Sequence, residues 1–120
     1  MTDLNQAQLI AEQNDHFRSN FASLINPNDP IQGKYNVTQG FINMSVLDQF
    51  IATIKIRNYN DFNRDNDPYG EHDYGSFKLN GETICWKIDY YDLNYEYGSE
   101  NPANRTQTRR VLTAMLKHEW

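Results

Sequence analysis

The feature that most constrains this chain is an Asn-Gly pair between two runs of alternating apolar residues. Asn80 and Gly81 separate residues 76–79 from residues 82–90, and both residue types tolerate the positive φ angles of a two-residue type I′ turn. The sequence therefore predicts a β-hairpin. Because successive side chains alternate between the two faces of a strand, one face is apolar and must point to the core; it carries Phe77, Leu79, Ile84, Trp86, Ile88 and Tyr90.

The two-residue turn also predicts which residues oppose each other across the hairpin. Counted back from the turn, continued pairing places Tyr74 opposite Lys87 and His72 opposite Asp89, all on the polar face. A histidine beside a carboxylate is held in one tautomer or made a stronger base, as acid–base chemistry requires. The polar face is therefore a candidate site, and the alternative is an ordinary cross-strand pair on a solvated surface.

Three further segments have the apolar spacing of amphipathic helices, and residues 34–38 are typical of a short strand. The first helix is expected over about residues 2–23, capped by Thr2 or Asp3. The second begins at the capping-box pattern of Ser45 and Asp48 and ends near Asn58, and the third spans about residues 104–117. Their apolar faces are Leu9, Ile10, Phe17, Phe21 and Leu24; Leu47, Phe50, Ile51 and Ile54; and Val111, Leu112, Met115 and Leu116.

These elements predict an α+β fold in which about three helices pack on one face of a small antiparallel sheet centred on the hairpin. The 120 residues, of which 38% are hydrophobic, suit a single domain over residues 1–120 without a disulfide or metal staple. The only cysteine, Cys85, rules out an internal disulfide and a cysteine zinc cage. It is expected to point away from the core, opposite Ser76, and no neighbouring histidine supports it as a nucleophile.

The charge balance bears on partners. There are 16 Asp and Glu against 11 Lys and Arg, a formal net charge of −5, which disfavours direct nucleic-acid binding. The acidity either keeps the chain in solution or meets a basic partner. No apolar run approaches the roughly 18 residues of a membrane span, and residues 1–6 lack the pattern of a signal peptide, so we expect a cytoplasmic protein without a membrane partner.

Residues 61–73 crowd several carboxylates into one loop and begin like a calcium-binding EF-hand. The pattern fails at Asn66, where glycine is needed, and at His72, where a bidentate glutamate is needed. Phosphate-binding, dinucleotide-binding, serine-hydrolase and zinc-protease motifs are also lacking from the sequence. We therefore expect neither a metal nor a cofactor.

Residues 89–100 combine four tyrosines with four acidic groups. Tyrosine offers rigid, amphipathic contact area, and interspersed carboxylates complement a basic protein; the alternative is that these are half-buried sheet residues with hydroxyls in water. The binding surface expected here, together with the polar face of the hairpin, comprises Tyr74, Lys87, Asp89, Tyr91, Asp92, Tyr95, Glu96, Tyr97 and Glu100.

Four segments carry a resemblance to a known family. They are DNDPYGEHDYGSF at residues 65–77, WKIDYYD at 86–92, YGSENPA at 97–103 and TRRVLT at 108–113, with a looser match at residues 9–15. The chain resembles a family of small bacterial proteins, one of the catalogued domains of unknown function, often met on plasmids and other mobile elements. The resemblance implies a setting in which small acidic proteins act on host defence systems, and it implies that His72, Asp73, Lys87, Asp89 and Tyr91 are a family feature.

The leading functional expectation is a binding module without catalysis, acting as a phage- or plasmid-encoded inhibitor of a nucleic-acid-handling defence complex. The alternative is a small enzyme that uses His72 with Asp89 or Glu71, with or without a divalent cation. A third alternative is a homodimeric structural protein that associates through the hairpin or the C-terminal helix.

Overall fold

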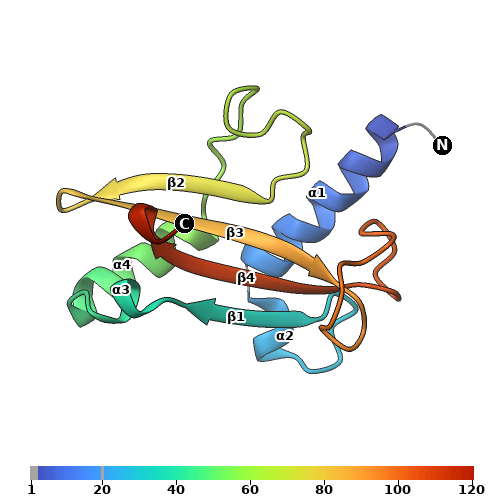
Figure 1. The fold of residues 1–120 in the computed structure, drawn as a ribbon, viewed down its shortest axis with the longest axis horizontal. Helices are drawn as coiled ribbons and strands as arrows, with labels where there is room; N and C mark the ends of the chain where they lie inside the picture. Colours follow the sequence, from blue (N-terminus) through green and yellow to red (C-terminus); the bar gives the residue numbers. More distant parts are fainter. Residues whose placement is uncertain (1–2, 20) are drawn as a thin grey trace.

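The structure is a computed structural model that describes residues 3–19 and 21–120 (Figure 1). Within these ranges no helix is both long enough and apolar enough to cross a membrane. In chain order the elements are α1 (Asp3–Ser19), α2 (Ala22–Ile25), β1 (Gly33–Val37), α3 (Gln39–Ile42), α4 (Val46–Arg57), β2 (Tyr74–Leu79), β3 (Glu82–Tyr91), β4 (Arg109–Leu116) and the 3₁₀ helix η1 (Lys117–Glu119).

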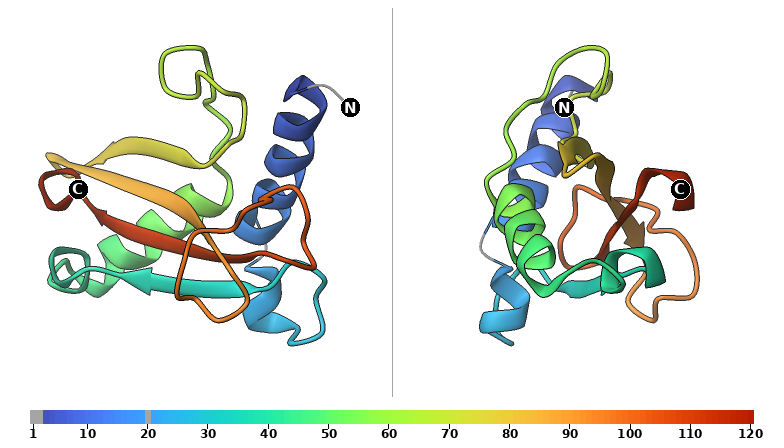
Figure 2. Two further views of the ribbon diagram at one scale, coloured as in Figure 1. Left: turned by 45° about the vertical axis from the view of Figure 1, so that its right-hand side comes forward. Right: turned by 90° about the vertical axis from the view of Figure 1, so that its left-hand side faces the viewer.

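The four strands form one sheet in the order β1-β4-β3-β2. β1 runs parallel to β4, whereas the β4–β3 and β3–β2 pairs are antiparallel. Helices α1 and α4 lie on one side of the sheet, and η1 and the loop between β3 and β4 lie on the other (Figures 1 and 2). The predicted α+β class is confirmed. The sheet is mixed rather than antiparallel throughout, because α3, α4 and the hairpin intervene between β1 and the strand beside it.

The central hairpin forms as predicted. Asn80 and Gly81 have φ angles of 48° and 84°, as a type I′ turn requires, and Tyr74 pairs with Lys87 in the expected register. The apolar face of the hairpin points to the helices. The buried core cluster comprises Phe17, Ile31, Phe41, Ala52, Ile56, Ile84, Trp86, Ile88, Leu112, Ala114 and Leu116.

The C-terminal segment departs most from the prediction. Apolar spacing predicts a helix over residues 104–117, but residues 109–116 form β4, which pairs with β3 along its whole length. Leu112 and Ala114 are buried toward the helices and Met115 is buried on the opposite side. Apolar residues on both faces of a central strand imitate helical spacing, and pairing with β3 overrides that local signal.

The N-terminal helix is shorter than predicted. α1 ends at Ser19, and the short helix α2 follows Phe21, which has a φ of 45°. In a continuous helix the Phe17 carbonyl would accept a hydrogen bond from residue 21; it accepts one instead from the Tyr35 hydroxyl (2.8 Å). The Tyr35 contact therefore competes with continuation of the helix.

The faces of this N-terminal region are only partly as predicted. Ile10 and Phe17 are buried, but Leu9 is 37% exposed and Leu24 is 70% exposed. Thr2, expected as a start or cap, lies outside the described residues.

Helix α4 begins where predicted but turns a different face to the core. The Ser45 hydroxyl accepts a hydrogen bond from the Asp48 amide (3.1 Å), whereas the Asp48 carboxylate accepts one from Asn80 (2.7 Å) rather than completing the capping box. Ala52 and Ile56 are the buried residues of α4. Of the four residues predicted to face the core, Ile51 is half-buried and the other three are exposed: Leu47, Phe50 and Ile54.

Cys85 gives a direct test of this packing. It pairs with Ser76 and points away from the helices, as predicted, yet it is fully buried, and η1 packs against its strand. Burial raises the pKa of the Cys85 thiol, and the thiolate is the reactive form. We expect no reaction with a thiol-specific dye at neutral pH in the folded protein and stoichiometric reaction in guanidinium; rapid labelling of the folded protein would contradict the packing.

Candidate functional site

Residues 92–98, the tyrosine loop, follow β3 and are ordered by one carboxylate. Asp92 accepts hydrogen bonds from the backbone amides of Asn94 (3.1 Å) and Glu96 (3.0 Å), and its own amide donates to the Tyr97 carbonyl (2.8 Å). Such side-chain capping of a turn is characteristic of aspartate. The structure therefore places Asp92, a predicted binding residue, in the framework of the loop.

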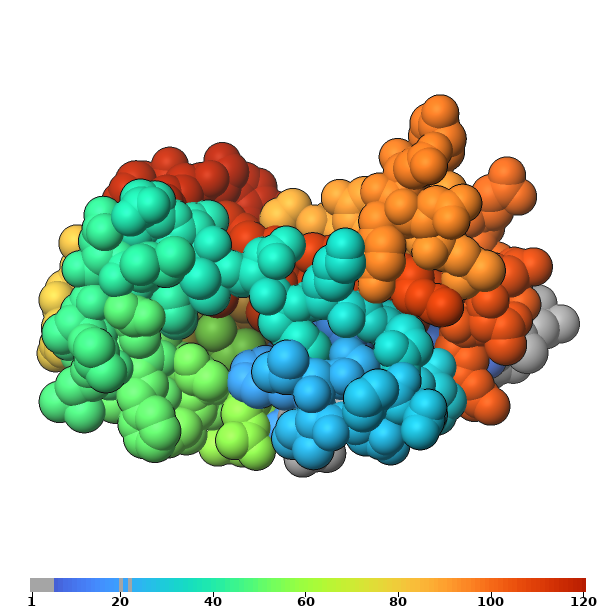
Figure 3. Space-filling model, turned by 90° about the horizontal axis from the view of Figure 1, so that it is seen from below, coloured from blue at the N-terminus to red at the C-terminus, as the bar shows by residue number. Residues whose placement is uncertain are grey.

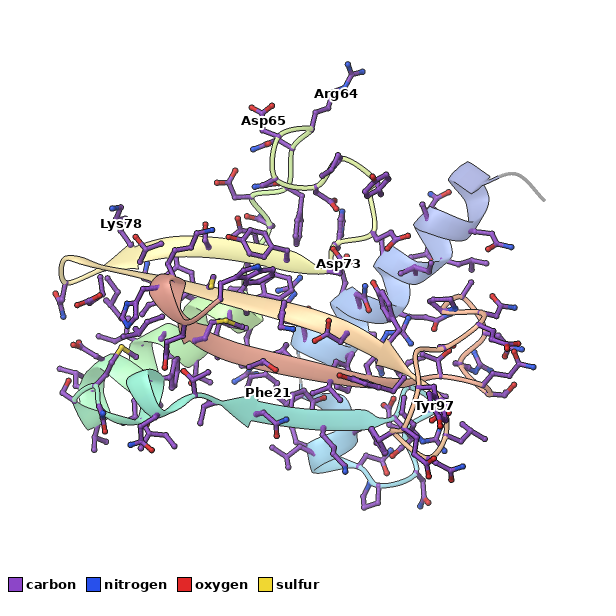
Figure 4. All side chains as sticks on the ribbon, viewed as in Figure 1. Phe21, Arg64, Asp65, Asp73, Lys78 and Tyr97 are labelled. Carbon is purple, nitrogen blue, oxygen red and sulfur yellow. The ribbon has the colours of Figure 1, made fainter. Side chains whose placement is uncertain are left out.

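Two of the predicted tyrosines lie against the sheet and a third projects from it. The Tyr91 and Tyr95 rings are 6.4 Å apart, and the Lys34 ammonium lies 4.1 Å from the centre of the Tyr95 ring, a cation–π distance. The side chain of Tyr97 is 73% exposed. Figure 4 shows Tyr97 and Lys78 at opposite ends of the sheet, so the tyrosine loop forms one end of the candidate surface.

The polar face of the hairpin continues this surface. The Lys87 ammonium lies 2.6 Å from the Asp89 carboxylate, and the Tyr74 hydroxyl accepts a hydrogen bond from Lys117 (3.0 Å). The Trp120 ring meets Tyr74 edge to face at 5.1 Å. The sequence predicted Tyr74, Lys87 and Asp89 but missed Lys117 and Trp120, because the strand ending at residue 116 was expected to be a helix.

A groove of about 610 Å³ opens at this end of the hairpin, under the loop of residues 58–73. Its walls combine aromatic side chains with both signs of charge. The lining residues include Asp65, Tyr69, Asp73, Tyr74, Lys87, Asp89, Lys117 and Trp120.

Most of the positive charge of the candidate surface lies on the strands, and its negative charge lies mainly on and beside the tyrosine loop. Sheet register places Lys34, Lys87 and Arg109 on the face away from the helices, with Asp89 among them. Glu96 on the tyrosine loop is exposed, and so is Glu100, which follows the loop. A partner that covers both regions therefore meets a basic strand surface beside an acidic rim. The strand residues Lys34, Lys87, Asp89, Tyr91 and Arg109, with Tyr74, are called the open sheet face below.

The predicted pair of His72 and Asp89 does not form. β2 begins only at Tyr74, and His72 has a φ of 57°, outside the range of a strand. The Asp67 carboxylate accepts hydrogen bonds from the amides of Glu71 (3.1 Å) and His72 (3.2 Å). These bonds hold residues 71 and 72 in a turn rather than beside β3. The pairing of the hairpin therefore does not extend back to His72.

His72 lies instead at the helix side of the protein. Its Nδ1 is 3.0 Å from both carboxylate oxygens of Asp15, and its Nε2 is 3.7 Å from Asp67. The imidazole stacks on Phe62 with 4.0 Å between ring centres. The carboxylates beside His72 are thus Asp15 and Asp67, in place of the predicted Asp89 and Glu71. Asp15 is 57 positions away in sequence, so no local pattern could have identified it.

Arg18 ties the Asp15–His72 pair to the core. Its guanidinium is buried, bonds Asp15 (3.0 Å) and donates to the Ile56 carbonyl (2.7 Å). It lies 4.9 Å from the Trp86 ring. Burial lowers the pKa of Arg18, and Asp15 opposes that shift. A cavity of about 650 Å³ beside these groups is lined by Asp15, Arg18, Ser19, Arg57, Asn58, Tyr59, Asn60, Phe62 and His72.

A second buried polar network anchors the loop that carries His72. Asn14 accepts a hydrogen bond from Arg110 (2.6 Å) and donates to the Tyr90 hydroxyl (2.8 Å) and to the Glu71 carbonyl (2.9 Å). The Tyr90 hydroxyl in turn donates to Asp73 (3.2 Å). Because buried polar groups require partners, this network fixes α1, β3, β4 and the loop relative to one another.

The pKa values of the acidic side chains in and beside this network are shifted. Burial raises the pKa of Asp73, and burial with the nearby charges of Asp73 and Asp67 raises the pKa of Glu71. Burial lowers the pKa of Arg110 to about 10, so the guanidinium stays charged at neutral pH. The pKa values of both acidic side chains are therefore raised, and the charge of Glu71 acts on the buried Arg110.

The described residues contain no group of three or more His, Cys, Asp or Glu arranged to hold a metal ion. In the carboxylate loop, Asp67 is engaged with backbone amides, whereas Figure 4 shows Arg64 and Asp65 at its outer tip. The chemistry that this side of the molecule offers is that of a histidine–aspartate pair.

The Asp73 carboxyl gives a prediction about pH. Its pKa is raised in the folded state, so the folded state holds this proton more tightly than the unfolded chain, and its ionisation makes folding less favourable as the pH rises. Asp73→Asn keeps an acceptor for Tyr90 without the charge. We expect this variant to gain thermal stability over wild type at neutral pH and to lose that advantage in acid, measured by circular dichroism melts. A constant deficit at every pH would contradict this.

Comparison with protein families supports one part of the resemblance noted in the sequence, the similarity to a domain of unknown function. Residues 37–119 match the family model described as Protein of unknown function (DUF3768). This range includes α4, the hairpin, the tyrosine loop and β4, whereas Asp15 and Arg18 precede it. The comparisons with curated proteins and with solved structures gave no match. Because the match covers most of its length, the chain belongs to this family, Protein of unknown function (DUF3768).

Proposed function

We propose that this protein is a binding module without catalysis, which contacts a protein partner through the tyrosine loop and the open sheet face. The observation that supports this is the rigid loop: the Asp92 carboxylate fixes its backbone while Tyr97 remains 73% exposed. A preorganised aromatic side chain loses little entropy on binding, and tyrosine is common among residues that dominate interface energy.

The charges support a protein rather than a nucleic acid as the partner. Exposed Glu96 and Glu100 border the surface, and the chain carries a net charge of −5, so a polyanion would be repelled at the rim. Basic side chains of the partner would meet these two glutamates. Lys34, Lys87 and Arg109 would meet acidic or carbonyl groups nearer the centre.

The biological setting that we propose is the bacterial cytoplasm, with the gene on a phage or plasmid. There the protein would inhibit a host defence complex that handles nucleic acid, by occupying the lysines and arginines that otherwise hold phosphates. What supports this is the acidity of the chain together with its resemblance to a family often met on mobile elements.

The experiment is a pull-down from a host lysate followed by binding kinetics with the captured partner. Glu96→Lys and Glu100→Lys together should slow association severalfold, because rim charges act on the encounter rate. Tyr97→Ala should raise the dissociation rate by about tenfold or more. Asp92 is left unchanged, because its carboxylate holds the loop backbone.

Matched controls are Glu82→Lys at the hairpin turn and Ile25→Ala, which replaces an apolar residue of α2 that is 74% exposed. Both should bind like wild type. If the control variants lost as much binding as the tyrosine-loop variants, the proposed surface would be wrong.

A second candidate, a small acid–base enzyme, is favoured by one observation. Asp15 lies 3.0 Å from His72 Nδ1, a contact that would fix the orientation of the imidazole for acid–base chemistry. Nε2 lies 3.7 Å from Asp67, and His72 borders a cavity of about 650 Å³. Among the described residues, however, no serine, threonine or cysteine side chain is hydrogen-bonded to His72.

The enzyme candidate predicts turnover of hydrolysable model esters or phosphodiesters by wild type. Activity should fall by about 100-fold or more in His72→Asn, on the scale of general-base catalysis. Asparagine suits this position because it tolerates the positive φ of His72. Equal rates for wild type and His72→Asn would remove the enzyme candidate.

A further inference from the structure

Strand β1 forms one edge of the sheet, and its backbone groups alternate between the neighbouring strand and the free side. β1 stands at the end of the strand order and pairs with β4. The Thr38 amide donates to the Ala114 carbonyl, and the Gln32 carbonyl accepts from the Arg110 amide, both at 3.1 Å. Because the direction of these groups alternates along a strand, the even-numbered residues of β1 bond β4. The odd-numbered residues therefore direct their amides and carbonyls to the free edge.

One end of this edge is covered and the rest is open. The Gly33 carbonyl accepts a hydrogen bond from the Ser23 hydroxyl of α2 (3.4 Å), which closes the edge at that residue. Within residues 3–19 and 21–120, no hydrogen bond reaches the outward backbone groups of Tyr35 or Val37. An extended chain has donors and acceptors at the same spacing, so another strand is the group that such an edge receives.

The open part of the edge is accessible. Figure 3, which views the molecule from below, shows β1 at the surface between α2, in blue, and α4, in green. Lys34 and Asn36 are exposed, and Val37 is 46% exposed. A strand can therefore approach the outward groups of Tyr35 and Val37 without displacing a helix.

The register of β1 shows which side chains an added strand would meet. Val37 pairs with Ala114, which is buried toward the helices, whereas Lys34 pairs with Val111 on the open sheet face. An added strand continues the same two faces of the sheet. On the helix side its neighbours would be Val37 and Ile42 of α3, which is 50% exposed. Its neighbour on the open side would be the Lys34 ammonium.

This edge adjoins the surface proposed above. Lys34 belongs to the open sheet face, and its ammonium lies 4.1 Å from the centre of the Tyr95 ring in the tyrosine loop. A protein that covers the tyrosine loop and the open sheet face therefore also reaches β1.

We propose that the protein partner adds an extended strand to the free edge of β1 and so continues the sheet. The added strand carries apolar residues on the helix side, beside Val37, and an acidic residue on the open side, beside Lys34. This inference rests on the proposed function, because the strand belongs to the partner that contacts the tyrosine loop.

The first test is amide hydrogen exchange of the full chain, followed by nuclear magnetic resonance with and without the captured partner. In the free protein, β4 should protect the amides of Lys34 and Asn36, whereas those of Tyr35 and Val37 should exchange rapidly. The partner should slow exchange at Tyr35 and Val37 by about tenfold or more, because both amides become hydrogen-bond donors. Exchange at Lys34 and Asn36 should change less.

The second test removes one outward amide. Proline has no N–H and is tolerated in edge strands where that group faces solvent, so Val37→Pro leaves the hydrogen bonds between β1 and β4 in place. The variant should bind the partner about tenfold more weakly, as loss of one backbone hydrogen bond predicts. The control Val37→Thr keeps the amide and the branched side chain and should bind close to wild type. The exchange experiment uses wild type, so it decides the matter even if Val37→Pro does not fold.

The possible failures are distinguishable. If binding depends on Tyr97 but the Tyr35 and Val37 amides exchange as in the free protein, the added strand is wrong and the proposed function stands. Equal losses of affinity in Val37→Pro and Val37→Thr would also overturn the added strand. Protection of the two amides that rises with the concentration of the chain alone would make the occupant a second copy and overturn the proposal. If no partner is captured, or if Tyr97→Ala binds it like wild type, both proposals fail.

Discussion

The rest of the structure depends on the alternation of side chains along β3. This strand is central, paired with β2 on one side and with β4 on the other, so its two faces become the two faces of the sheet. Ile84, Trp86 and Ile88 point to the helices and are buried, while Lys87 and Asp89 point to the opposite side and form their ion pair there. A shift of one residue would exchange these faces and place charges in the core.

Two buried arginines connect that core to the polar loops. Arg18 lies over the Trp86 ring and bonds Asp15, the partner of His72. Arg110 bonds Asn14, which in turn holds Tyr90 and the loop backbone. Since an unpaired buried charge is costly, both arginines limit where α1 and the loop before β2 can lie. The candidate features therefore have a rigid framework.

Local chemistry could be read from the sequence and long-range contacts could not. The Asn80-Gly81 turn and the Ser45 cap are set by neighbouring residues, and both occur as predicted. The prediction of a helix over residues 104–117 was wrong because pairing with β3 makes residues 109–116 a strand. The prediction that Leu47, Phe50 and Ile54 face the core was wrong for a related reason. Periodicity identifies a stripe of apolar residues on a helix but does not show what the stripe contacts. The Asp15–His72 contact joins distant segments without any local pattern.

The central claim is that a partner covers the open sheet face and the tyrosine loop. The most direct measurement is nuclear magnetic resonance mapping of amide shifts as the captured partner is added to isotope-labelled protein. The account predicts shifts along residues 87–98 and in β4, with those of α1 and of the loop around His72 unchanged. Shifts confined to the cavity beside His72, with none in the tyrosine loop, would contradict it.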